Sequence, residues 1–201
     1  MSEDSGHECG VEREYDKLAD EALMALVAQG RREAFTVLVG RHQAGVMGVA
    51  YRFMGQRDVA EDVAQDVFLK VWRSASAFRP EAQFTTWLYR LTANLCWDRR
   101  RRAAREARFR IAFLQTRTAS EPPSNLDSHE RVELVRRAVA RLPDRQRLAV
   151  ILHRYAGLSH REIAEVTGWS VKAVESCLVR GYGALRKSLA QLDSRRANQA
   201  R

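Results

Sequence analysis

Residues 57–73, RDVAEDVAQDVFLKVWR, carry apolar side chains at helical spacing along one face and acidic side chains along the other. Residues 84–102, FTTWLYRLTANLCWDRRRR, also show helical spacing, with aromatic residues early and four arginines at the end. No segment of the chain sustains the period-two alternation that is typical of a half-buried strand. We therefore expect an all-α fold in which two consecutive helices carry opposite charge.

The apolar and polar segments predict two small helical domains joined by a flexible linker. A chain of 201 residues with 45% apolar content can bury the cores of such domains. Pro122, Pro123, Ser124 and Asn125 disfavour a continuous helix between them. We divide the chain into a polar acidic tail at residues 1–19, a helical domain at 20–102, a linker at 103–129, a second helical domain at 130–190 and a polar tail at 191–201.

A long helix is predicted from about residue 31 to Met54, with Gly55 ending it. Its interior contains Gly45 and Gly48, each of which weakens a helix by ~1 kcal/mol relative to alanine. We expect this loss of helix stability to be compensated only where a glycine allows a second helix to approach closely.

The net charge of +9 indicates a polyanionic partner. A membrane surface could also attract such a chain. However, no apolar run approaches the roughly 20 residues that a spanning helix needs. The N-terminus also lacks the basic-then-apolar pattern of a signal peptide. We expect a cytoplasmic protein that does not insert into membranes.

The three cysteines, Cys9, Cys96 and Cys177, are far apart and form no CxxC pair. This spacing predicts reduced thiols and neither a disulfide framework nor a zinc site. His7 and Cys9 could be read as two metal ligands, but two ligands in a polar tail rarely form a site without others nearby. We expect no metal and no cofactor.

The outer face of the helix at 57–73 has Glu61, Asp62, Gln65, Asp66 and Leu69. An exposed leucine among acids favours a docking surface for a basic protein. By periodicity alone, a solvated face remains the commoner explanation. Carboxylates one turn apart also occur in catalytic and metal sites, but no histidine or second carboxylate helix completes such a site here.

The aromatic helix and the loop before it suit a nucleic acid strand with accessible bases. Phe78 is expected to anchor the loop, while Ser74, Ser76 and Arg79 could line a pocket for an unstacked base. Judged individually, an aromatic residue such as Trp87 is more often part of a core. The nearby arginines favour base stacking with a cation-held backbone.

Residues 159–189 have the plan of a helix-turn-helix. Ser159 and Glu162 have the spacing of a capping box, residues 167–169 form the turn, and Ser170 can cap the second helix. The exposed face of that helix predicts base contacts from Lys172, Glu175, Ser176 and Val179, and phosphate contacts from Arg180, Arg186 and Lys187. A helical hairpin that never touches DNA is the alternative.

Three segments together resemble the extracytoplasmic-function sigma factors of bacterial RNA polymerase. They are RDVAEDVAQDVFLKVWR, FTTWLYRLTANLCWDRRRR and LPDRQRLAVILHRYAGLSHREIAEVTGWSVKAVESCLVRGYGALRKSL, in that order. The resemblance runs from about Asp20 to Leu189. It implies that the first domain is sigma region 2 and that the second domain is sigma region 4.

The resemblance assigns roles to three sets of residues. Asp62, Gln65 and Asp66 are implied to dock onto the coiled coil of the largest polymerase subunit, with Glu61, Leu69 and Arg73 beside them. The surface for the melted minus-ten element is implied to comprise Ser74, Ser76, Phe78, Arg79, Trp87, Arg90, Asn94, Arg99, Arg100, Arg101 and Arg102. The minus-thirty-five element would be read by Ser170, Lys172, Glu175, Ser176, Val179, Arg180, Arg186 and Lys187.

The implied function is a non-enzymatic initiation factor. Its implied partners are core RNA polymerase, through the largest and second-largest subunits, double- and single-stranded promoter DNA, and an anti-sigma factor; no small-molecule substrate is implied. The chain departs from the family at Gly181 and Tyr182, where alanine and arginine are frequent, and at Glu175, where lysine is frequent. A stand-alone helix-turn-helix regulator is the alternative, whereas an enzyme acting on nucleic acid lacks the residues it would need.

Overall fold

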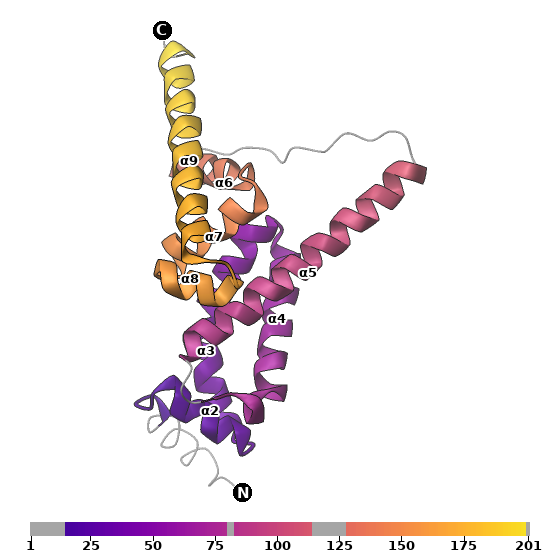
Figure 1. The fold of residues 1–201 in the computed structure, drawn as a ribbon, viewed down its shortest axis with the longest axis vertical. Helices are drawn as coiled ribbons and strands as arrows, with labels where there is room; N and C mark the ends of the chain where they lie inside the picture. The colour runs from indigo at the N-terminus through magenta and orange to yellow at the C-terminus, as the bar shows by residue number, and fades with distance from the viewer. Residues whose placement is uncertain (1–14, 80–82, 114–127, 200–201) are drawn as a thin grey trace, which may run out of the picture.

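The computed structural model describes residues 15–79, 83–113 and 128–199. Over these residues it contains eight α-helices, one short 3-10 helix and no strand (Figure 1). The helices are α2 Asp20–Ala28, α3 Arg32–Met54, α4 Arg57–Arg73, α5 Phe84–Phe113, α6 Ser128–Ala140, α7 Asp144–Tyr155, α8 His160–Thr167 and α9 Val171–Gln199, with the 3-10 helix η1 at Ala75–Ala77. The predicted all-α fold is confirmed.

Local sequence signals account for where several helices end. Gly55 follows α3 with φ +81°, and Gly168 follows α8 with φ +70°, a region of backbone conformation that glycine adopts without a steric penalty. At the start of α8, the Ser159 side chain accepts from the backbone N–H of Glu162, and the Glu162 carboxylate accepts from the N–H of Ser159. The predicted capping box is therefore present.

Helices α2 to α5 pack around one apolar core. Phe53 of α3, Val67 of α4 and Leu88 of α5 are fully buried in it. Gly45 lies where α5 approaches α3, since a Cβ atom at this position would be 2.6 Å from the Tyr89 hydroxyl oxygen. A Cβ at Gly48 would instead meet Arg52 of the same helix. Gly45 therefore leaves room for the Tyr89 side chain of α5, whereas no contact with a second helix is found at Gly48 among the described residues.

Two helices are longer than the sequence predicted. Helix α5 continues past Arg102 to Phe113, into the segment that we assigned to the linker. The added residues AAREARFRIAF are rich in alanine, arginine and glutamate, which favour helix. Helix α9 continues past residue 190 to Gln199. The prolines at 122 and 123 lie outside the described residues.

The two helical blocks contact each other through α3 with α7 and through α5 with α8 (Figure 1). Arg147 of α7 is 6% exposed and lies between them. Its guanidinium donates to the backbone oxygen of Phe53 at 3.3 Å, to that of Leu142 at 2.9 Å and to that of Ala140. Burial lowers the pKa of Arg147, and backbone oxygens compensate much of the lost hydration.

Partly buried side chains, together with the exposed ring of Tyr155, add two further contacts around the same interface. Arg100 of α5 bonds the Asp144 carboxylate of α7 at 3.0 and 3.1 Å. The guanidinium of Arg52 lies 3.9 Å from the centre of the Tyr155 ring. In this structure the two predicted domains therefore pack against each other.

Candidate functional site

Helix α4 presents the predicted acidic face to solvent. Glu61, Asp62, Gln65 and Leu69 are exposed, and Asp66 is partly exposed. Leu69 keeps half of its surface accessible, although it stands among charged residues. The surface thus combines an apolar side chain with carboxylates, as a docking site for a basic partner requires.

Arg99 of α5 reaches across to this face. Its Nη1 donates to Oδ2 of Asp62 at 3.1 Å, and its Nη2 donates to Oδ2 of Asp66 at 2.7 Å. The bond to Asp66 is the main reason that the pKa of Arg99 is raised. Because Asp62 and Asp66 remain 62% and 45% exposed, this bridge contributes no more than about 1 kcal/mol per pair to stability. Sequence reasoning placed Arg99 among the DNA-binding arginines and did not foresee this bridge.

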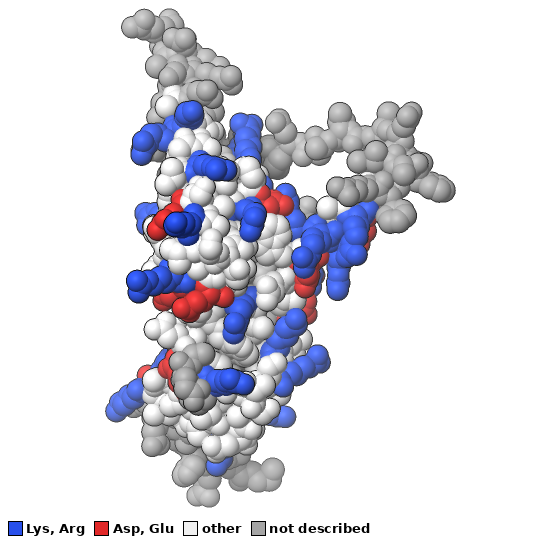
Figure 2. Space-filling view, in the orientation of Figure 1, with Lys and Arg blue, Asp and Glu red and all other residues white. Residues whose placement is uncertain are grey.

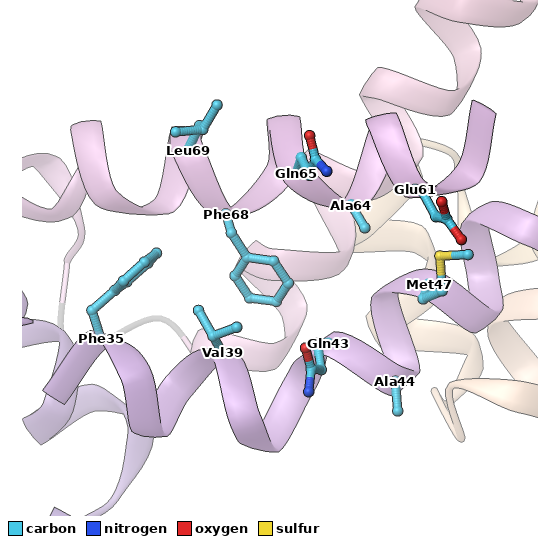
Figure 3. Close-up of a pocket in the computed structure, with 10 residues that line it drawn as sticks. All are labelled: Phe35, Val39, Gln43, Ala44, Met47, Glu61, Ala64, Gln65, Phe68 and Leu69. Carbon is cyan, nitrogen blue, oxygen red and sulfur yellow. The ribbon is translucent and has the colours of Figure 1, made fainter. Parts of the chain in front are cut away.

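A pocket of about 750 Å³ opens between α3 and α4 beside the acidic face. It is lined by Phe35, Val39, Gln43, Ala44, Met47, Glu61, Ala64, Gln65, Phe68 and Leu69. Figure 3 shows the Phe68 ring directed from α4 towards Val39 of α3. This pocket was not predicted from the sequence. The available signal was the four-residue spacing from Phe35 through Val39 and Gln43 to Met47.

An aromatic cluster supports the loop after α4. The Phe78 ring lies 5.3 Å from Trp87 and 6.1 Å from Phe84 between ring centres, so Phe78 is the expected anchor. The Glu21 carboxylate accepts from the backbone N–H of Phe84 at 2.9 Å and caps the start of α5. Sequence reasoning missed this role of Glu21, which fixes where the loop ends.

The polar residues predicted for the minus-ten surface lie along this loop and the start of α5. Ser76, Arg79, Arg90 and Asn94 are exposed, whereas Ser74 is partly buried. Trp87 is partly buried within the aromatic cluster. Residues 80–82 of the loop lie outside the described residues.

The four arginines at 99–102, which were predicted to bind DNA together, have different partners in the structure. Arg99 bonds the acids of α4, Arg100 bonds Asp144, and Arg101 bonds Asp98 of its own helix. Arg102 has no hydrogen-bond or ion-pair partner in the part of the chain that the structure describes. In Figure 2, lysine and arginine side chains gather over the C-terminal half of α5, with acidic side chains beside them.

The helix-turn-helix is formed by α8 and α9. Ser170 accepts from the backbone N–H of Ala173 at 3.3 Å and caps the second helix as predicted. The Trp169 ring in the turn lies under the Arg145 guanidinium, 4.5 Å from ring centre to Cζ. Ile163 and Val166 bury the inner face of α8. The turn therefore holds α9 in a fixed orientation relative to α7 and α8.

The predicted reading face of α9 is accessible. Lys172, Glu175, Val179, Arg180, Arg186 and Lys187 are exposed, and Ser176 is partly exposed. Val179 is 74% exposed, so its side chain is accessible on this face. A carboxylate oxygen of Glu175 lies 3.8 Å from Nδ1 of His160.

The two family departures at Gly181 and Tyr182 have structural reasons. A Cβ at Gly181 would lie 2.8 Å from Cγ2 of Val150, so glycine allows α9 to pack closely on α7. The Tyr182 hydroxyl lies 2.8 Å from Nδ1 of His153, also on α7. Both residues therefore serve the packing of α9.

The described residues contain no group of histidine, cysteine and acidic side chains that could hold a metal ion. Burial raises the pKa of the Cys96 thiol to about 12, so Cys96 stays protonated and unreactive at neutral pH. Cys96 and Cys177 are both free thiols. His7 and Cys9 lie outside the described residues.

Comparison with known proteins matches both helical blocks. The family model for Sigma-70 region 2 matches residues 38–106, and that for Sigma-70 region 4 matches residues 133–185. The chain is 33% identical to the ECF RNA polymerase sigma-E factor of Haemophilus influenzae, over 82% of this chain and 92% of that protein. The chain belongs to the extracytoplasmic-function sigma factors. It is also 31% identical to the RNA polymerase sigma-H factor of Pseudomonas aeruginosa, over 86% of this chain and 95% of that protein.

Solved structures agree with this family assignment. The sigma factor is similar to CnrH in complex with the cytosolic domain of CnrY, with a TM-score of 0.63 and 31% identity over 88% of this chain and 99% of that chain. Its fold is also that of RpoE in complex with the anti-sigma factor NepR from Bartonella quintana, with a TM-score of 0.65, 23% identity and coverage of 78% and 96%. No helix among the described residues has the length and apolarity needed to cross a bilayer.

Proposed function

We propose that this sigma factor binds core RNA polymerase through the outer face of α4 and directs it to promoters with two DNA-binding surfaces. The observation that carries the proposal is the exposure of Asp62, Gln65, Asp66 and Leu69, to which the family resemblance assigns docking. The proposal includes no catalytic role for the sigma factor. It places the protein in the cytoplasm, where core polymerase acts.

Charge and shape support docking of a basic, partly apolar partner on α4. Asp62 and Asp66 each bond Arg99 through Oδ2, so each Oδ1 remains available for a cation of the largest polymerase subunit. Leu69 lies beside both the acids and the pocket between α3 and α4. An apolar side chain of the coiled coil could therefore enter the pocket while its basic neighbours pair with the acids.

The two proposed DNA-binding surfaces recognise different promoter elements. The loop at Ser74–Arg79 and the exposed Arg90 and Asn94 face the melted minus-ten strand, and binding energy there offsets unstacking, which costs a few kcal/mol. Helix α9 enters the major groove at the minus-thirty-five element, with contacts to the second-largest subunit nearby. Glu175 suits the amino group of cytosine, and Val179 suits the methyl group of thymine.

Regulation by an anti-sigma factor is part of the proposal. RpoE, which shares the fold, was solved with the anti-sigma factor NepR. The acidic face and the apolar pocket offer such a protein an exposed target on this chain. A regulator seated there would block access to core polymerase.

The double variant Asp62→Arg with Asp66→Arg tests the docking surface. It should lose association with purified core polymerase in a gel-filtration or fluorescence binding assay, because cations replace both acids. The matched control Glu33→Arg with Glu165→Arg makes the same charge change at two exposed acids outside the proposed surfaces and should bind normally. Wild-type affinity in the first variant would refute the docking surface. Retained promoter binding without polymerase association in the wild type would instead favour a stand-alone regulator.

A further inference from the structure

Helix α2 lies against the loop between α4 and α5, the loop that is proposed to capture an unstacked base. The 3-10 helix η1 at the start of this loop contacts α2, and its residue Ala75 is 5% exposed. At the end of the loop, Oε1 of Glu21 in α2 accepts a hydrogen bond from the backbone N–H of Phe84 at 2.9 Å. Helix α2 therefore contacts the loop region at both of its ends.

A second contact reaches Phe84 from α3. The ring centre of His42 lies 5.2 Å from that of Phe84, which is fully buried. On its other side, Nε2 of His42 lies 2.7 Å from Oδ2 of Asp20 in α2. Two consecutive acids of α2 thus act on one aromatic residue, Glu21 through the backbone N–H and Asp20 through the His42 ring.

Arg41 fixes the Asp20 carboxylate from the opposite side. Nη1 of Arg41 donates to Oδ1 of Asp20 at 2.7 Å and to the backbone oxygen of Leu18 at 2.8 Å. Its Nη2 donates to the backbone oxygen of Asp16 at 2.7 Å. The side chains of Asp20 and His42 are only 18% and 15% exposed, so little water competes for these bonds. The carboxylate therefore holds the His42 ring in one orientation.

Phe84 passes this orientation on to residues that are proposed to meet DNA. Its ring centre lies 6.1 Å from that of Phe78 in the loop and 6.0 Å from that of Trp87 on α5. Trp87 is one turn before Arg90 on the same helix. Binding groups discriminate between ligands only when neighbouring residues hold them in place. A displaced Phe84 would shift the loop and the first turns of α5 together.

We propose that Asp20, Glu21 and His42 are positioning residues for capture of the minus-ten base. They act through Phe84 and not by contact with DNA. The role rests on the proposed function, since it needs an unstacked base at the loop. Charge on the DNA surfaces sets the overall affinity, whereas these three residues set how well the loop distinguishes one base from another.

The test separates base discrimination from overall affinity. Holoenzyme assembled from core polymerase and the full chain is offered a pool of single-stranded oligodeoxynucleotides of random sequence, and the bound fraction is sequenced. Core polymerase alone gives the background. The wild type should enrich one base at one or more positions of the bound strands.

Glu21→Met and His42→Leu should both weaken this enrichment. Glu21→Met keeps the length of the side chain and removes the acceptor, so enrichment should fall by roughly 2- to 10-fold for the loss of one hydrogen bond. Glu21→Gln keeps an oxygen that can accept from the N–H of Phe84 and should retain most of the enrichment. The matched control Glu33→Met makes the same change at an exposed acid of α3 and should behave as the wild type.

Two results would overturn the proposal: wild-type enrichment in both Glu21→Met and His42→Leu, or equal losses of enrichment in Glu21→Gln and Glu21→Met. Total single-strand affinity and association with core polymerase should stay within about 2-fold of the wild type in the folded variants, because the charged surfaces are unchanged. A loss of affinity in proportion to the loss of enrichment would also count against a positioning role. A thermal melt of each variant checks that the fold is retained.

Amide exchange in the wild-type chain tests the contact itself and needs no variant. Phe84 is the first residue of α5, so its N–H has no acceptor within the helix. The bond to Glu21 should slow its exchange well below that of an exposed amide, and free exchange at Phe84 would overturn the role of Glu21. Failure of the proposed function has a different signature, because the wild-type holoenzyme would then enrich no base over core polymerase alone.

Discussion

Nη2 of Arg99 donates a 2.7 Å hydrogen bond to Oδ2 of Asp66 and so joins α5 to α4, the helix that carries the proposed docking face. The same guanidinium also holds Asp62. Both acids keep Oδ1 free of other hydrogen bonds in the described structure. The carboxylates of the proposed docking face are thus oriented in the absence of a partner.

This orientation predicts that Arg99→Gln weakens binding to core polymerase. Arg99→Gln frees two carboxylates. Ordering a freed side chain on association costs roughly 0.5–1.5 kcal/mol, so affinity should fall by about 2- to 10-fold for each carboxylate that the partner engages. Equilibrium titration with labelled protein measures the change. Arg101→Gln, which removes an arginine from the same helix, serves as the control. Unchanged or tighter binding by Arg99→Gln would show that the bridge does not organise the surface.

Because α9 packs closely on α7, alanine substitution should change the stability of the protein in opposite directions at Gly181 and Gly183. Gly181→Ala should destabilise the protein by about 1–3 kcal/mol, because the new Cβ would lie 2.8 Å from Val150. Gly183→Ala has no atom within 4 Å of its new Cβ and should stabilise the helix by about 0.5–1 kcal/mol. Urea unfolding of the two variants measures both changes. Equal effects at the two positions would contradict the packing described here.

Truncation of Arg147 should cause a large loss of stability, although the sequence around Arg147 suggests an ordinary surface arginine. Arg147→Ala removes bonds to the backbone oxygens of Phe53, Ala140 and Leu142 and should cost roughly 2–4 kcal/mol of unfolding free energy. The control Arg141→Ala truncates an exposed arginine and should change stability by no more than about 0.5 kcal/mol. Denaturant unfolding that gives the same small loss for both variants would exclude the structural role of Arg147.

Signals close in sequence predicted much of this fold. Gly55 ends α3, residues 57–73 form α4, and Ser159 with Glu162 caps α8, because each depends on neighbours within one or two turns. The acidic face of α4 followed from the same periodicity. Local sequence therefore predicted these helix ends and the exposed face of α4.

Contacts between distant segments could not be predicted in this way. Arg99 lies far along the chain from Asp62, and nothing in either segment indicates which arginine of the run faces the acids. The burial of Arg147 likewise depends on Phe53, which belongs to the other helical block. The end of α5 was misplaced because the prolines downstream suggested an earlier break than the helix-favouring residues after Arg102 allow.

The capping box predicts a pH-dependent contribution to stability. The bonds to Ser159 lower the pKa of Glu162 below its ordinary 4.5, so this contribution is present above that value and is lost as pH falls through the lower folded-state pKa. Glu162→Gln should therefore differ most from the wild type at neutral pH and least in acid, by urea unfolding. A difference that grows on acidification would contradict the sign. Glu165→Gln, on the same helix, removes a carboxylate that bonds nothing in the described structure and should leave neutral-pH stability within about 0.5 kcal/mol.

Run-off transcription with purified core polymerase tests the central claim most directly. A library of random-sequence promoters is transcribed with core alone, with core and the wild-type protein, and with core and the Asp62→Arg, Asp66→Arg variant. The wild type should produce transcripts from a subset of templates that share two elements, and the variant should produce none. Absence of any transcript that depends on the wild-type protein, or equal transcription with the variant, would contradict the account.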